Sequence, residues 1–206
     1  MAHSQLYTLE LTCPKSVESL LLQEATELGL ENAKERPAGV SGQATLETAY
    51  RLCLWSRLAN RVLLVLSHTK INSADELYQA VQAIDWRDHL AVDGSFAIDF
   101  TGRGSGIDNS HFGALKVKDA IVDALRDKQG RRPDVSKKQP DVRIHAHIQR
   151  GHLTLAIDLS GDSLHQRGYR LQQGAAPLKE NLAAAILQRA NWPELAKQGY
   201  ALTDPM

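Results

Sequence analysis

The sequence predicts an α+β protein built from small domains, and three observations support this class. Residues 6–66 follow the order strand, helix, two strands, helix, strand, which is the ferredoxin-like arrangement. Residues 96–159 add a strand, a long helix and a pair of strands that alternate between apolar and polar side chains. After residue 177, a helix and a short strand are expected to begin a further, incomplete α/β layer.

The elements of the first third follow from apolar spacing and from residues that end helices. A first helix is expected to begin near Pro14 and to end at Gly29. A second helix is expected from Thr48 to about Arg61, with Trp55 in the core in preference to a base-stacking position. The expected strands of this region are residues 6–11, 30–36, 40–46 and 62–66.

Composition excludes several classes of protein. Hydrophobic residues make up 43% of the chain and charged residues 23%, which is typical of globular domains. The longest aliphatic run, residues 62–66, is too short to span a bilayer, and no signal segment opens the chain. Cys13 and Cys53 have no metal or disulfide spacing, so both are expected to be reduced thiols in a cytoplasmic protein.

Charge is balanced overall but is distributed unevenly along the chain. Lys and Arg number 24, as do Asp and Glu, yet residues 103–170 carry a net charge of +5 and the remainder −5. This asymmetry permits a basic face on the middle segment. The overall neutrality argues against a protein that coats nucleic acid indiscriminately.

The middle segment is expected to start a second α/β unit. Ser73 and Glu76 form a capping box at the start of one helix, and Asn109 or Ser110 caps a longer one. Between them, residues 101–106 hold three glycines but lack the Lys-Ser/Thr ending of a phosphate-binding loop and the spacing of a dinucleotide fingerprint. A mobile loop near RNA is therefore preferred to a nucleotide site.

Residues 142–149 and 152–159 are predicted to form a two-residue hairpin, in which glycine supplies the positive φ of the turn. His145, His147 and His152 lie on its polar side, where three imidazoles are potential zinc ligands. No acidic or sulfur ligand accompanies these histidines at matching spacing. No metal is therefore expected.

Residues 160–170 combine a Gly-Asp-Ser turn signal with two arginines and a tyrosine. Arg167 and Arg170 supply planar donors suited to phosphate, and Tyr169 offers a flat face on which a base can stack. An interdomain linker whose arginines pair with nearby carboxylates explains the same pattern.

Five segments together resemble a known family. They resemble the approach to the catalytic domain of THUMP-containing RNA methyltransferases, above all the bifunctional K/L type that acts on bacterial 23S ribosomal RNA. The resemblance covers essentially the whole chain. The segments that carry it are residues 55–59, 115–123, 167–170, 176–186 and 204–206.

The resemblance implies a domain order. A ferredoxin-like N-terminal domain is followed by a THUMP domain and then by the incomplete start of a Rossmann-like methyltransferase domain. The expected boundaries are residues 1–68, residues 69–165 with a start as early as residue 48, and residues 166–206.

The resemblance also implies the chemistry of a longer enzyme. In the family, the sequence Asp-Pro-Met is followed by a Cys-Gly-Ser-Gly loop that wraps S-adenosylmethionine, whereas this sequence stops at Met206. We therefore expect a truncated part of a guanine-N2 methyltransferase, inactive by itself. No catalytic residue, cofactor or metal is expected in it, and S-adenosylmethionine is the cofactor of the parent enzyme.

The expected partner is 23S ribosomal RNA, and no membrane is involved. Lys116, Lys118, Arg167 and Arg170 are the predicted phosphate contacts, and Tyr169 is the predicted stacking residue. Ion pairing within the helix is the alternative reading of the two lysines. Two other functions stay open: a structural scaffold that orients the catalytic domain, and a THUMP module that binds transfer RNA.

Overall fold

The computed structural model describes residues 5–91, 93–129, 134–136, 138–168 and 177–203, without the side chains of residues 127–129. The chain divides into two compact units. The first unit combines residues 1–62 with residues 162–206, and the second consists of residues 63–161.

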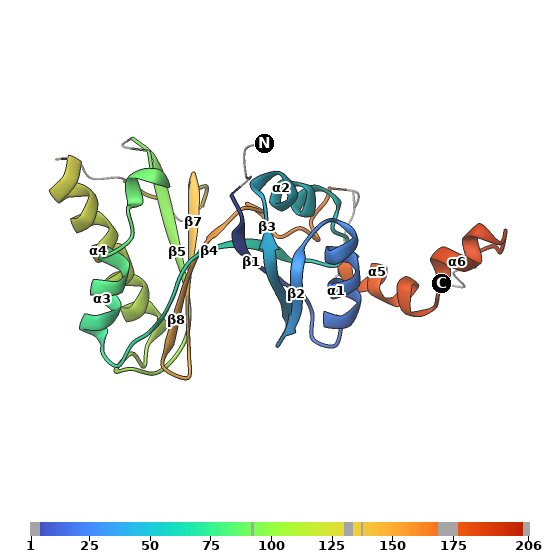
Figure 1. The fold of residues 1–206 in the computed structure, drawn as a ribbon, viewed down its shortest axis with the longest axis horizontal. Coiled ribbons are helices and arrows are strands. Elements are labelled where there is room, and N and C mark those ends of the chain that lie inside the picture. Colours follow the sequence, from blue (N-terminus) through green and yellow to red (C-terminus); the bar gives the residue numbers. More distant parts are fainter. Residues whose placement is uncertain (1–4, 92, 130–133, 137, 169–176, 204–206) are drawn as a thin grey trace. The chain divides into compact units, whose positions relative to one another are not determined.

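The first unit confirms the ferredoxin-like order. Its sheet has the strand order β2-β3-β1, with β4 next to β1, and β1 pairs with β3 in antiparallel register from Tyr7↔Ala44 to Thr12↔Gly39. Both helices contact the sheet (Figure 1). The elements are β1 (Tyr7–Thr12), α1 (Glu18–Glu27), β2 (Glu31–Arg36), β3 (Gly39–Ala44), α2 (Leu46–Trp55) and β4 (Arg61–Lys70). Residues 63–70 of β4 belong to the second unit.

Both helix starts in this unit differ from the prediction. α1 begins at Glu18 and not near Pro14, because Ser16 adopts a left-handed backbone conformation with φ of 67°. α2 is capped by Thr45 and not by Thr48, since the Thr45 side chain accepts a hydrogen bond from the Thr48 N–H at 3.2 Å.

The end of α2 and the position of Trp55 were also predicted wrongly. The helix stops at Trp55, not near Arg61, and the Trp55 side chain is 64% exposed. The prediction treated residues 48–61 as one continuous helix. Leu58 and Ala59 are buried, but they reach the core from the segment that follows the helix.

The second unit is a mixed sheet with helices on one side (Figure 1). Its strand order is β4-β8-β7-β5-β6, in which β8 is antiparallel to both neighbours and β5 is parallel to β6 and β7. Phe96, Ile121 and Ile144 belong to the core between helices and sheet. The elements are α3 (Ala74–Gln82), the 3₁₀ turn η1 (Trp86–Asp88), β5 (Ser95–Gly102), α4 (Ser110–Gln129), β6 (Asp134–Val135), β7 (Val142–Gln149) and β8 (His152–Asp158).

The predicted hairpin is confirmed. Along β7, Ile144, Ala146 and Ile148 are buried, while the side chains between them are at least partly exposed. The turn residues Arg150 and Gly151 have φ of 51° and 76°, as a two-residue hairpin of this twist requires.

Neither Cys13 nor Cys53 forms a disulfide. Cys13 is buried, and this burial, together with the nearby Glu18 carboxylate, raises the pKa of Cys13 to about 12. Cys53 is half-buried. None of the described helices is long and apolar enough to cross a membrane.

The C-terminal segment contains one helix more than predicted. α5 (Glu180–Arg189) matches the expected helix. Asn191, with φ of 57°, then turns the chain, and Pro193 lies in the first turn of α6 (Trp192–Lys197). The strand expected near the C-terminus is not present in the described residues 201–203, and residues 204–206 lie outside the described residues.

Gly113 provides a test of the core packing in the second unit. A Cβ atom at this position would lie 2.5 Å from ring carbons of Phe100, so Gly113→Ala should lower the free energy of unfolding by about 1–3 kcal/mol despite its better helix propensity. Urea unfolding can follow the buried Trp86 after Trp55 and Trp192 are changed to Phe. The same change in a Phe100→Leu background should cost almost nothing; an equal loss in both backgrounds would contradict this packing.

Candidate functional site

A cavity of about 640 Å³ lies at the outer edge of β5 in the second unit. It is open here because β6 pairs only with Ser95 and Phe96, so that beyond Phe96 the described residues add no strand to this edge. Helix α4 forms the facing wall. The lining residues are Ala97, Ile98, Asp99, Phe100, Thr101, Ser110, His111, Ala114, Leu115, Lys118, Val135, Arg143 and His145.

The charges in this cavity are mainly positive. The lining carries two basic side chains, Lys118 and Arg143, and the imidazoles of His111 and His145. Asp99 is the one carboxylate among the described lining residues. Arg143 Nη1 lies 3.3 Å from both carboxylate oxygens of Asp99. Lys118 is in turn paired with Asp119, which lies outside the lining, so a phosphate group bound here would replace the carboxylates of Asp119 and Asp99 as the partner of these two cations.

His145, on the polar side of the sheet, contacts two carboxylates. Its Nε2 lies 3.3 Å from Oδ2 of Asp158 and 3.7 Å from Oδ2 of Asp99. The parallel pairing of β5 with β7 places Asp99 directly beside His145. Arg143 was not predicted as a binding residue, and His145 was considered only as a zinc ligand; both alternate with buried residues along β7.

The predicted lysines lie in different surroundings. Residues two apart on a helix point in nearly opposite directions. Lys118 lines the cavity, and its Nζ is 2.9 Å from Oδ1 of Asp119. Lys116 instead faces α3, where its Nζ is 3.3 Å from Oδ1 of Asp75 and 5.6 Å from the centre of the Tyr78 ring.

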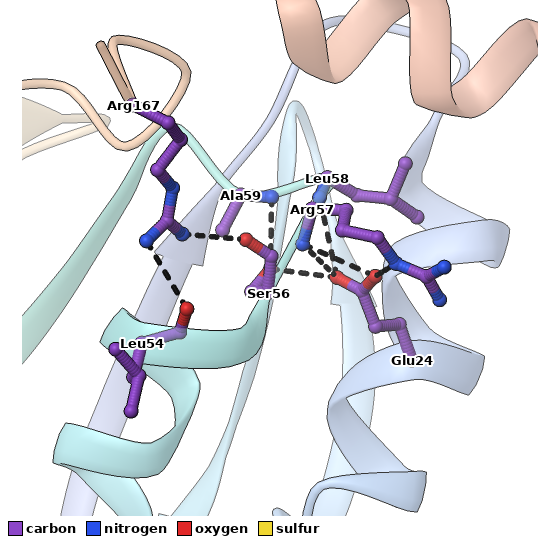
Figure 2. Close-up of polar contacts among 7 residues, drawn as sticks. All are labelled: Glu24, Leu54, Ser56, Arg57, Leu58, Ala59 and Arg167. Atoms are coloured by element: carbon purple, nitrogen blue, oxygen red, sulfur yellow. Dashed lines mark hydrogen bonds and ion pairs between the residues drawn. The ribbon is translucent and has the colours of Figure 1, made fainter. Parts of the chain in front are cut away.

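Arg167 lies in the first unit, at the end of α2. Its Nη1 donates to the Leu54 carbonyl at 3.1 Å, and its Nη2 donates to the Ser56 carbonyl at 2.7 Å (Figure 2). The last carbonyls of a helix have no N–H partner within the helix, because no further turn follows. Arg167 therefore holds residues 162–168 against α2. Tyr169 and Arg170, the other two predicted residues, lie outside the described residues.

A buried carboxylate on the other side of the same turn was not predicted. Glu24 of α1 is 6% exposed and accepts hydrogen bonds from the Ser56 hydroxyl at 2.6 Å and from the backbone N–H groups of Arg57 and Leu58 (Figure 2). Arg57 Nε lies 3.4 Å from the same carboxylate. The sequence holds one sign of this buried carboxylate: Glu24 is an acidic residue within the apolar face of the predicted first helix.

The C-terminal segment is also fixed to this turn. Leu164 N–H donates to the Asn60 carbonyl at 2.8 Å. Asn181 of α5 is fully buried and donates from Nδ2 to Oδ1 of Asn60 at 2.7 Å. Arg189 donates to the backbone carbonyl of Ser16. Within the first unit, residues 162–168 and helix α5 are therefore anchored on residues 16–60 at several points.

The histidines of the hairpin contact different partners. His147 Nδ1 lies 2.8 Å from the Thr101 hydroxyl, and the His152 ring stacks on His68 with centroids 5.3 Å apart. Within the described part of the chain, no three His, Cys, Asp or Glu side chains are arranged to hold a metal ion.

Comparison with known proteins gives three matches to family profiles. Residues 8–63 match the RlmL ferredoxin-like domain, residues 72–158 match the THUMP domain, and residues 167–206 match the RMKL-like methyltransferase domain.

The chain is 66% identical over 203 residues to the ribosomal RNA large subunit methyltransferase K/L of Ectopseudomonas mendocina. The match covers 98% of this chain and 28% of that protein, so the chain spans little more than a quarter of this relative's length.

Two solved structures share the fold. One is described as a predicted N6-adenine-specific DNA methylase from Listeria monocytogenes, with a TM-score of 0.80 and 31% identity over 89% of this chain and 48% of that one. The other is SMU.472 in complex with SAH, with a TM-score of 0.79 and 28% identity over 91% and 50% of the two chains.

Replacement of Glu24 tests the buried carboxylate. Glu24→Ala would leave the Ser56 hydroxyl and two backbone N–H groups without their acceptor, so we expect a loss of about 3 kcal/mol or more in the free energy of unfolding. Glu24→Gln keeps one acceptor oxygen and should cost less. Glu27→Ala, an exposed change on the same helix, should stay within about 0.5 kcal/mol. Equal effects of Glu24→Ala and Glu27→Ala in chemical denaturation would contradict the assigned role.

Proposed function

Because residues 8–63 belong to the RlmL ferredoxin-like domain family and residues 72–158 to the THUMP domain family, we propose that this chain is the RNA-binding part of a ribosomal RNA methyltransferase. The similarity to ribosomal RNA large subunit methyltransferase K/L names the substrate class, and 23S ribosomal RNA is the proposed partner. In the proposed enzyme, the THUMP domain holds structured RNA while one guanine reaches the catalytic domain, which methylates its N2 atom.

The observation that carries this proposal is the positive cavity inside the THUMP match. Lys118 and Arg143 are the cations of its lining, and a phosphate group there would gain two charge-assisted contacts in exchange for their ion pairs with Asp119 and Asp99. Lys116 is proposed as a further phosphate contact, although it would have to leave Asp75. Arg167, Arg170 and Tyr169 remain proposed contacts on the C-terminal segment.

S-adenosylmethionine is the proposed methyl donor of the whole enzyme. The RMKL-like match over residues 167–206 and the SAH complex of SMU.472 support this cofactor. When bound, it supplies an electrophilic methyl group. The residues of this chain contribute RNA binding and orientation, and we propose that they have no catalytic activity alone.

A scaffold role is the second candidate, and the contacts of the C-terminal segment favour it. Arg167 donates to two carbonyls, and Asn181 is completely buried against the turn that follows α2. Such contacts would fix the start of the methyltransferase domain, whose family match begins at residue 167. In this case the chain would orient the enzyme without binding RNA itself.

Salt-dependent binding to a 23S ribosomal RNA fragment separates the two candidates. Each phosphate contact that is lost should reduce the slope of log affinity against log salt by roughly 0.7 to 0.9. We expect this reduction for Lys118→Gln and for Arg143→Gln, and no change for Lys197→Gln on α6, which is 72% exposed. Absence of binding at low salt would favour the scaffold, and stronger competition by transfer RNA would contradict the ribosomal assignment.

A further inference from the structure

The outer side of α2 carries three large apolar side chains. Tyr50, Leu54 and Trp55 are 58%, 65% and 64% exposed, respectively, and we call them the α2 patch. Tyr50 and Leu54 lie four residues apart on one helix face and Trp55 borders that face; all three are on the side away from the buried Ala49 and Leu52. Single exposed apolar residues are common on protein surfaces, but a contiguous group on one helix face indicates a binding surface.

The charges around the α2 patch are mainly positive. Arg51 and Arg57 have side chains that are 47% and 66% exposed, and Arg167 lies against the end of the helix. The carboxylates are Glu47, paired with Arg51 at 2.7 Å, and Glu24, which is nearly inaccessible to solvent. Arg51 and Arg57 are therefore each paired with a carboxylate, Arg57 on the side of α1, and Arg167 adds a third guanidinium that has no carboxylate among these contacts.

Arg167 also changes the electrostatic potential at the C-terminal end of α2. The C-terminus of a helix carries a partial negative charge, which repels phosphate. Here the guanidinium donates to the carbonyl of Leu54, itself a member of the patch, and to that of Ser56 (Figure 2). The end of α2 beside Trp55 is thereby made favourable to an anion.

We propose that the α2 patch stacks unpaired bases of a single-stranded RNA segment, whose phosphates lie beside Arg51 and the end of α2 that Arg167 binds. Trp and Tyr rings offer flat faces to bases of any sequence, and arginine supplies both charge and a stacking plane. The proposal rests on the RNA-binding function proposed above and places a second RNA contact on the ferredoxin-like domain, separate from the THUMP cavity.

A protein partner fits this surface less well than RNA. A stable protein interface buries about 800 Å² on each partner, with an apolar centre low in charge. Three side chains that are already partly covered supply far less area, and arginines flank them. Small stacking surfaces with basic surroundings are typical of single-stranded nucleic acid sites.

The test is binding of the full chain to a single-stranded RNA oligonucleotide of mixed sequence. Trp55→Ala should weaken binding by roughly fivefold to a hundredfold, the range for loss of one stacked base. Because stacking involves no counterion, the salt slope should stay unchanged, whereas Arg51→Gln should reduce it. Trp55→Phe should retain most of the affinity, and Tyr200→Ala, which removes an aromatic side chain that is 62% exposed in the C-terminal segment, should have no effect.

Fluorescence gives a second measurement. With Trp192 changed to Phe, Trp55 is the exposed tryptophan and Trp86 is only 1% exposed, so RNA should quench mainly the Trp55 emission. Tyr50→Ala serves as a second variant, and circular dichroism checks that each variant is folded.

Three outcomes would overturn the proposal. Wild-type affinity in both Trp55→Ala and Tyr50→Ala, with slopes still reduced in the Lys118 and Arg143 variants, would remove the α2 patch and leave the proposed function intact. A dimer in sedimentation that Trp55→Ala converts to monomer would assign the patch to a second copy of the chain. Failure of the wild-type chain to bind any RNA at low salt would overturn both.

Discussion

The first unit depends on one buried negative charge. A carboxylate inside a protein is costly unless its lone pairs are satisfied, and Glu24 is satisfied by a hydroxyl, two backbone N–H groups and a guanidinium. These donors come from Ser56, Arg57 and Leu58, which directly follow α2. The charge therefore decides where α2 ends and ties α1 to the chain 32 residues later.

Arg167 complements Glu24 across the same turn. The carboxylate accepts hydrogen bonds from the N–H groups that follow α2, and the guanidinium donates hydrogen bonds to the last carbonyls at its end (Figure 2). Both sets of backbone groups at this helix end are therefore hydrogen-bonded, and the C-terminal segment is attached beside it through Asn60. Folding of the ferredoxin-like domain and placement of the C-terminal segment are thus controlled by the same few residues.

Local patterns were predictable from the sequence, and long-range ones were not. Strict alternation and an Arg-Gly turn were enough to predict β7 and β8, because both signals are read from adjacent residues. The end of α2 was missed because it depends on Glu24, which lies in another helix. The cavity was missed for a similar reason: Lys118 and Arg143 come together only through the packing of α4 and the parallel pairing of β5 with β7. Family resemblance could identify the domains but not these contacts.

The order of the two units along the chain has a consequence for synthesis on the ribosome. The second unit is continuous in sequence, whereas the first needs residues from both sides of it. The THUMP unit can therefore fold as soon as it emerges, and pairing of Leu63 with Asp158 then holds its entry and exit strands together. This pre-formed closure removes most of the entropy cost of joining the two distant parts of the ferredoxin-like unit. The nascent chain would complete its second unit before its first.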